Sequence, residues 1–136
     1  MITAADTGHL IVYVTDDPVD DAVVASATEM ISGKPVIIDA ARLENCYELA
    51  RTIACQTPGR NIVISNLLDA FYDSSILTRE AAQILGRVKS TLEQLVDEGV
   101  QIIVLCRRRS DNLGTRSHFM ASLCASADRV YFRRST

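Results

Sequence analysis

A chain of 136 residues with 48% hydrophobic and 23% charged side chains has the length and composition of one soluble globular domain with its own core. No apolar run approaches the roughly 20 residues that span a bilayer, and residues 1–6 lack the basic start of a signal peptide. The formal net charge of −3 counts against strong nonspecific binding of DNA by the isolated chain.

The first half of the chain alternates between strand and helix signals. His9–Thr15, a β-branched and aromatic run, predicts a strand that follows a loose leader at residues 1–8. Asp17 is the expected N-cap of the first helix, with Pro18 in its first position and Ser32-Gly33 at its end. A second strand and a second helix are predicted at residues 34–39 and 42–55.

The second half contains the clearest elements. The apolar run between Asn61 and Ser65 predicts a strand buried on both faces, because polar residues occur only at its ends. A long amphipathic helix is predicted from Thr78 to Glu98, and Gly99 is the expected C′ residue that ends it. The remaining predicted elements are a strand, a polar loop, a short helix and an edge strand at residues 100–106, 107–117, 118–126 and 128–134.

This alternation of short strands and helices defines the expected architecture. It predicts an α/β fold, namely a doubly wound, mostly parallel sheet of about five strands with helices on both faces and right-handed crossovers. Residues 1–136 are expected to form a single domain, since the chain has no internal repeat, low-complexity tract or linker.

Scattered cysteines indicate reduced thiols rather than a disulfide framework. They form no C-x-x-C pair and no zinc-ligand spacing, which favours small core hydrophobes in a cytoplasmic protein. These residues are Cys46, Cys55, Cys106 and Cys124.

The loop after the first strand is where a nucleotide would bind, because ligands of open parallel sheets sit outside the carboxyl ends of the strands. A nucleoside triphosphate needs glycines whose amides approach the phosphates, and a lysine. Residues 15–21 contain neither and carry four carboxylates instead. At ~4 Å each carboxylate repels a phosphate by ~1 kcal/mol even in bulk water, so we expect no nucleotide and no other cofactor.

The same acidic residues leave a metal site open as an alternative. Aspartates four positions apart share a helix face and suit hard cations, but acidic residues at a helix N-terminus are also ordinary complements of the helix dipole. Asp39 ends the second strand and is equally a metal ligand or a cap residue, while His9 and His118 lie in no catalytic motif. The acidic cluster consists of Asp16, Asp17, Asp20 and Asp21.

The second informative stretch is basic. Residues 1–50 hold nine acidic and two basic side chains, whereas residues 101–136 hold seven arginines and two aspartates. Arginine forks suit phosphate oxygens, so the basic end can face an anion or an acidic partner. It can equally neutralise the acidic end in space, and the sequence leaves both interpretations open. The candidates for nucleic-acid or anion contact are Arg107, Arg108, Arg109, Arg116, His118, Arg133 and Arg134.

Three stretches give the chain a resemblance to the ATPase core of the RecA/RadA recombinase superfamily. Gly33 to Asp39 and the following helix with Glu48-Leu49-Ala50 resemble the strand and helix after the family's nucleotide loop. Ile62 to Tyr72, ending in LLDAFY, resembles the Walker B strand and the residues after it. Leu113-Gly114-Thr115 and Ala125 to Arg134 resemble the exit of the family's second DNA loop and its last strands.

The chain departs from the family at each nucleotide-handling position. The Walker A loop is replaced by the aspartate-rich segment, and the Walker B aspartate falls at Asn66, or at Ser65 in a shift of one residue. The catalytic glutamate falls at Ala41 and the family's glutamine near Arg107. The resemblance therefore implies an ATPase-inactive paralogue rather than an enzyme. Such a protein would serve DNA recombination or repair by docking on a recombinase or paralogue and by contacting single-stranded DNA through residues 107–118.

Two other functions stay open at this point. The same scaffold could serve as a regulatory or oligomerisation module that self-associates, as a homo-oligomer, and binds no nucleic acid. Alternatively, the acidic cluster and Asp39 could bind a divalent metal ion.

Overall fold

A computed structural model describes residues 9–15, 19–29, 31, 34–43, 46–55, 61–67, 78–107, 121 and 123–133. The strands in this part of the chain are β1 His9–Thr15, β2 Val36–Asp39, β3 Ile62–Ser65, β4 Gln101–Arg107 and β5 Arg129–Arg133. The helices are α1 Asp21–Glu29, the 3₁₀ turn η2 Ala40–Arg42, α2 Cys46–Ala54 and α3 Thr78–Asp97. Residues 121 and 123–126 add a short helical segment. None of the helices within these ranges is long and apolar enough to cross a membrane.

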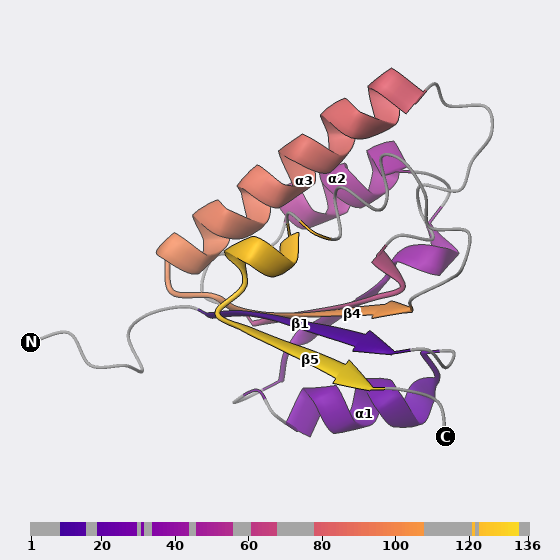
Figure 1. Cartoon of the computed structure of the whole chain (residues 1–136), viewed down its shortest axis with the longest axis vertical. Helices are drawn as coiled ribbons and strands as arrows, with labels where there is room; N and C mark the ends of the chain where they lie inside the picture. Colours follow the sequence, from indigo (N-terminus) through magenta and orange to yellow (C-terminus); the bar gives the residue numbers. More distant parts are fainter. Residues whose placement is uncertain are drawn as a thin grey trace, which may run out of the picture.

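The five strands form one sheet in which every neighbouring pair is parallel (Figure 1). The strand order is β2-β3-β4-β1-β5, so β1 lies between β4 and β5. This order differs from the dinucleotide-binding order 3-2-1-4-5-6 and from the flavodoxin-like order 2-1-3-4-5. The predicted α/β fold with a parallel sheet of five strands is confirmed, and β5 is an edge strand as expected.

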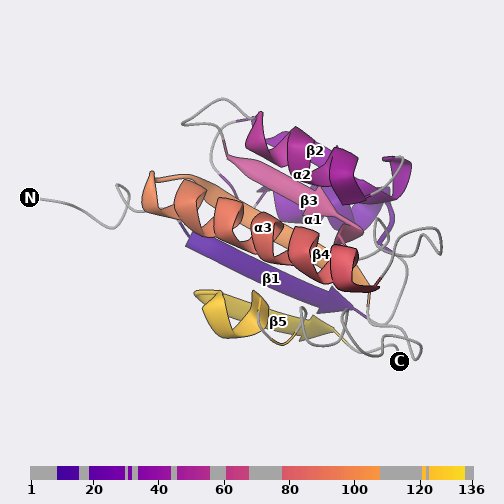
Figure 2. The ribbon, with the colours of Figure 1, turned by 90° about the horizontal axis from the view of Figure 1, so that it is seen from above.

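Helices cover both faces of the sheet (Figures 1 and 2). On one face α2, α3 and Leu123 of the short helical segment pack against the strands. On the other face α1 packs against β3 and β4. The chain passes from β1 across the sheet to the edge strand β2, and then returns through β3 and β4 and past β1 to β5. Because the direction of travel reverses at β2, right-handed crossovers require α1 and the later helices to lie on opposite faces.

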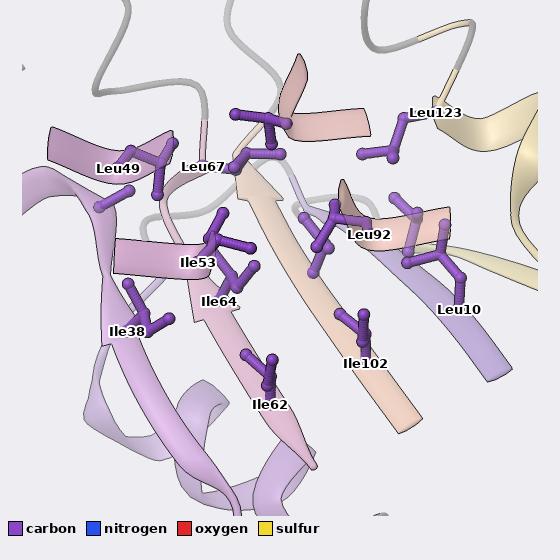
Figure 3. Close-up of a cluster of buried hydrophobic side chains, with 14 of the residues drawn as sticks. Leu10, Ile38, Leu49, Ile53, Ile62, Ile64, Leu67, Leu92, Ile102 and Leu123 are labelled. Carbon is purple, nitrogen blue, oxygen red and sulfur yellow. The ribbon is translucent and has the colours of Figure 1, made fainter. Parts of the chain in front are cut away.

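The larger core lies between the sheet and helices α2 and α3 (Figure 3). Ile64 of β3 and Ile102 of β4 lie in this core with Leu49 of α2 and Leu92 of α3, and all four side chains are fully buried. Fully burying one such side chain contributes about 1.5–3 kcal/mol. The opposite face carries a smaller core of Ala27, Ile31, Val63, Ile103 and Leu105.

β3 is buried on both faces, as the sequence predicts. All four of its residues are buried. Ile62 and Ile64 belong to the core under α2 and α3, whereas Val63 belongs to the core under α1. The unbroken apolar run is therefore explained by two opposed cores that meet at the same strand.

α3 ends in the glycine-dependent turn that the sequence predicts. Gly99 has a φ of 97°, in the left-handed region. Its N–H donates to the Val96 carbonyl at 3.0 Å, and the Val100 N–H donates to the Leu95 carbonyl at 3.0 Å. These two bonds form a Schellman motif, and Leu95 and Val100 share the same core cluster. The role predicted for Gly99 is confirmed.

Three element starts differ from the predictions by two residues or more. α1 begins at Asp21 rather than at Pro18, because the side chain of Asp20 caps it. β2 begins at Val36, since Pro35 has no N–H with which to extend the ladder. α2 begins at Cys46, because η2 occupies the residues directly after β2. The predicted leader at residues 1–8 lies outside the described residues.

Candidate functional site

The carboxyl ends of the five parallel strands lie at one edge of the sheet, where open α/β sheets bind ligands. After β1 the chain passes to the α1 face, whereas after β4 it passes to the face of Leu123, so the topological switch point lies between these adjacent strands. The loops that follow these two strands, residues 16–18 and 108–120, lie outside the described residues. The strands themselves end at Thr15, Asp39, Ser65, Arg107 and Arg133.

Asn66 connects the ends of β2, β3 and β4. Its φ of 57° lies in the left-handed region, which asparagine tolerates better than most residues. Its backbone N–H donates to the Leu105 carbonyl of β4 at 2.9 Å. Its side-chain Nδ2 donates to Asp39 Oδ1 at 3.1 Å, and Arg42 Nε lies 3.4 Å from Asp39 Oδ2. The strand-end carboxylate of Asp39 is thus shared between an amide and a guanidinium, which together form the Asp39 cluster.

The Asp39 cluster gives a physical reason for a neutral side chain at position 66. A carboxylate in place of the Asn66 amide would stand about 3 Å from the Asp39 carboxylate. Two unit charges at that separation repel by ~1 kcal/mol in bulk water and by ~5 kcal/mol at an effective dielectric constant of 20. An amide instead donates a hydrogen bond, so the cluster favours asparagine over aspartate.

A cavity of about 470 Å³ lies against the Asp39 cluster. Asp21 at the start of α1 lines this cavity together with Ser65 and Asp39. The helix that follows β1 thus reaches the ends of β2 and β3, although β4 lies between β1 and β3 in the sheet. Among the described residues no three histidine, cysteine, aspartate or glutamate side chains are grouped so that they could hold a metal ion. Asp16 and Asp17, which the metal hypothesis also uses, lie outside the described residues.

The N-terminus of α1 is occupied by acidic side chains. Oδ1 of Asp20 accepts the Val23 N–H at 3.0 Å, and its carbonyl accepts the Val24 N–H at 3.1 Å. Asp21 follows in the first turn. Free N–H groups at a helix start attract phosphates, but here one donor is already bound to a carboxylate and the local charge is negative. The geometry therefore disfavours an anion at this end of α1.

Two of the predicted contact residues lie at described strand ends. Arg107 ends β4 and Arg133 ends β5, and both pair in register with Thr15 of β1. Two inter-strand spacings of about 4.8 Å put their backbones about 10 Å apart. Sequence positions 26 residues apart are thereby brought to the same row of the sheet. The other predicted contact residues, Arg108, Arg109, Arg116, His118 and Arg134, lie outside the described residues.

The cysteines whose side chains are described are free thiols: Cys55 is exposed, Cys106 buried and Cys124 half-buried. Burial raises the pKa of the Cys124 thiol, which keeps it protonated and unreactive at neutral pH. Cys106 and Cys124 contribute to the core under α2 and α3. These two act as small hydrophobic side chains, as predicted, whereas the prediction is wrong for Cys55, which is exposed directly after the end of α2.

Sequence reasoning misses two features of this edge. The periodicity places Arg42 in a helix, yet it contacts Asp39 from the 3₁₀ turn that follows β2. The sequence signal for this contact is the spacing of three residues between Asp39 and Arg42. Asp20 belongs to the acidic cluster of the metal hypothesis, but one of its oxygens is used to cap α1.

No protein-family model matches the chain, and no curated protein matches it. The class that the structure defines is an α/β protein built on an all-parallel sheet of five strands.

Proposed function

We propose that the chain is a RecA-like accessory protein without ATPase activity. It docks on a recombinase or a paralogue and contacts single-stranded DNA through the arginines that end β5 and that end and follow β4. The observation that carries this proposal is the chemistry of the carboxyl edge of the sheet. The strand-end carboxylate Asp39 is engaged by Asn66 and Arg42, and α1 starts with two aspartates.

This edge is poorly suited to a nucleoside triphosphate. Hydrolysis needs a phosphate-binding helix start and a free carboxylate near the metal-bound phosphates. The acidic start of α1 repels phosphate, and Asp39 already balances the charge of Arg42. The all-parallel sheet agrees with the RecA-like architecture only at the level of the fold, and fold alone does not define function.

The opposite charge lies at the ends of β4 and β5. Arg107 and Arg133 flank Thr15 in the same register row, and Arg108 and Arg109 follow directly in the sequence. Arginine binds phosphate oxygens through paired N–H groups. A cationic edge beside an acidic helix start favours a partner with an extended anionic backbone over a free nucleotide at the switch point.

The absence of nucleotide binding is tested by thermal unfolding with and without Mg²⁺-ATP. A ligand present at 100 times its Kd stabilises the folded state by about 2.7 kcal/mol, so binding would raise the Tm by several degrees. We expect no change in Tm and no phosphate release by the purified protein. A raised Tm or measurable turnover of ATP would refute this part of the proposal.

The DNA contact is tested by anisotropy titrations of a labelled single strand over a range of salt concentrations. Replacing Arg107, Arg108 and Arg109 by alanine should weaken binding and reduce the salt slope by about 0.7 for each phosphate that the variant no longer neutralises. The matched control replaces the exposed arginines of α2 and α3, which are Arg51, Arg79 and Arg87. Equal affinity in the two triple variants would remove DNA from the proposal.

Docking is tested separately by pull-down from the native cell, scored for a recombinase or paralogue.

A further inference from the structure

β2 is the outermost strand of the sheet on the side away from β5, and Ile38 marks it in Figure 3. Within the described residues β2 pairs only with β3, and it carries no charge before its last residue. Ile37 in its middle is 52% exposed, more than any other large hydrophobic side chain of the described residues. An apolar edge strand with an exposed aliphatic side chain is a surface on which another strand can pair.

The main chain of β2 has hydrogen-bonding groups that point away from the sheet. The Val36 N–H donates to the Asn61 carbonyl at 2.8 Å, so the peptide groups of Val36 face β3. Because these groups alternate in direction along a strand, those of Ile38 also face β3, whereas those of Ile37 face outward. In the part of the chain that the structure describes no strand pairs with the outward groups, and a partner strand would satisfy both of them.

The cavity of about 470 Å³ beside the Asp39 cluster lies at this edge. Val24 of α1 lines the cavity on one face of the sheet, and Leu43 lines it beside the core under α2 and α3 on the other face. Ile37 belongs to the same lining. A single cavity that joins both faces passes around β2, so none of the described helices covers this edge.

The charges along the β2 edge complement each other when two copies run antiparallel. The exposed Lys34 lies just before the strand. The carboxyl end carries the carboxylates of Asp21 and Asp39 and the guanidinium of Arg42, which give a net charge of −1. Antiparallel copies place the positive start of each strand at the negative end of the other. Parallel copies would instead bring like charges together at both ends.

A twofold axis at Ile37 gives a strand pair without conflicts. Ile37 of each copy then stands opposite Ile37 of the other as a hydrogen-bonded pair, in which each residue donates one N–H and accepts one. Val36 stands opposite Ile38, and Asp39 stands opposite Pro35, so no like charges face each other. Pro35 has no N–H to donate, which ends the ladder at this residue.

We propose that β2 of one copy pairs antiparallel with β2 of a second copy, so that two sheets join into one continuous sheet across a twofold axis at Ile37. The occupant is a second copy because the edge complements its own main-chain register and its own charges. β5 is the less suitable edge, since its exposed Arg129 is a charged residue of the kind that opposes strand pairing. This inference goes beyond the proposed function and does not depend on DNA binding.

Sedimentation equilibrium of the purified chain tests the proposal. A strand of four residues is a small contact, and small interfaces are typical of weak association, so the range should extend from about 10 μM to about 1 mM. We expect the mass to rise with concentration from 14.9 kDa toward twice that value. Ile37→Lys places two ammonium groups opposite each other and should weaken association by at least about tenfold. Tyr131→Lys is the matched control, because it makes the same charge change on the other edge strand and should associate like the wild type.

Cross-linking provides a second readout that tests the register. In a hydrogen-bonded antiparallel pair the Cα atoms are about 5.5 Å apart, which is within the span of a disulfide. With the exposed Cys55 replaced by serine, Ile37→Cys should form a covalent dimer with oxidised glutathione, whereas the Cys55→Ser parent should stay monomeric.

Two outcomes would overturn the inference. One is a wild-type chain that stays monomeric over the whole range, which includes the case in which the edge accepts a strand of another protein. The other is association of folded Ile37→Lys at wild-type strength, since the contact would then lie elsewhere. Should Ile37→Lys fail to fold, absence of the Ile37→Cys cross-link would overturn the inference instead. The proposed function is tested separately by the nucleotide and DNA measurements, and none of these outcomes changes their interpretation.

Discussion

Replacing Asn66 by aspartate tests the electrostatic reasoning about the Asp39 cluster. Asn66→Asp keeps the shape of the side chain, and aspartate also tolerates the left-handed φ of 57°. The variant therefore changes one thing, since the amide that donates to Asp39 Oδ1 at 3.1 Å becomes a second carboxylate. The backbone bond from residue 66 to Leu105 is expected to remain.

The expected loss combines two effects. A hydrogen bond to a charged acceptor contributes about 1.5–3 kcal/mol, and repulsion at about 3 Å ranges from ~1 kcal/mol in water to ~5 kcal/mol at a dielectric constant of 20. The Asp39 side chain is 31% exposed and keeps Arg42 as a partner, so the repulsion lies near its lower limit. We expect a total loss of about 2.5–4 kcal/mol in unfolding free energy at pH 7. With an unfolding entropy of about 2.1 cal/mol/K per residue, this lowers the Tm by about 9–14 °C.

The pH dependence has a definite sign. In the folded variant the two adjacent carboxylates repel each other only while both are charged, so protonation of either one removes the added destabilisation. The destabilisation relative to wild type is therefore fully present at pH 7 and shrinks as the pH falls toward the ordinary aspartate pKa of about 3.9. Urea unfolding followed by circular dichroism at pH 7 and at about pH 4 measures this destabilisation, with Asn66→Gly as the uncharged control. Wild-type stability at pH 7, or an equal loss at both pH values, would refute the reasoning.

Four further substitutions test the description of the helices and core by thermal or urea unfolding. Gly86→Ala should stabilise the protein by about 0.5–1 kcal/mol, because a Cβ at this exposed helical position meets nothing within 4 Å; a lower Tm would contradict it. Gly99→Ala should destabilise it by about 1–2 kcal/mol, since its φ is 97°; an unchanged Tm would argue against the Schellman turn. Asp20→Ala should cost about 1 kcal/mol as a lost N-cap, and Asp20→Asn should restore it. Leu92→Ala should cost about 2–5 kcal/mol, because Leu92 is fully buried, whereas the exposed Gln94→Ala serves as a near-neutral control.

The elements that the sequence predicts best are those whose periodicity records burial. α3 has one apolar stripe, which must face a core. β3 instead has an unbroken apolar run without alternating polar residues, because both of its faces are buried. The predicted start of α1 is wrong because several aspartates precede the helix and each is a competent N-cap. Only the backbone geometry selects Asp20, through its bond to the Val23 N–H.

The strand order and the candidate contacts are less accessible to sequence reasoning. Short loops and alternating elements are compatible with several orders of a parallel sheet, and the placement of β1 beside β4 depends on pairing between distant residues. The Asn66–Asp39 bond exists because β2 and β3 are register partners. Likewise Tyr13 and Tyr131 meet only because the last strand returns to the edge next to the first. The arginine stretch is visible in the sequence, but its relation to Arg133 is not.

The position of β1 between β4 and β5 also constrains how the protein can be made. Each pairing partner of β1 lies roughly ninety or more residues downstream, as His9 with Gln101 and Ile11 with Arg129 show. During translation the first strand therefore emerges long before anything exists to accept its hydrogen bonds, while β2, β3 and α3 can already associate. Such distant pairing slows folding and leaves an apolar strand without its sheet partners until β4 has been made.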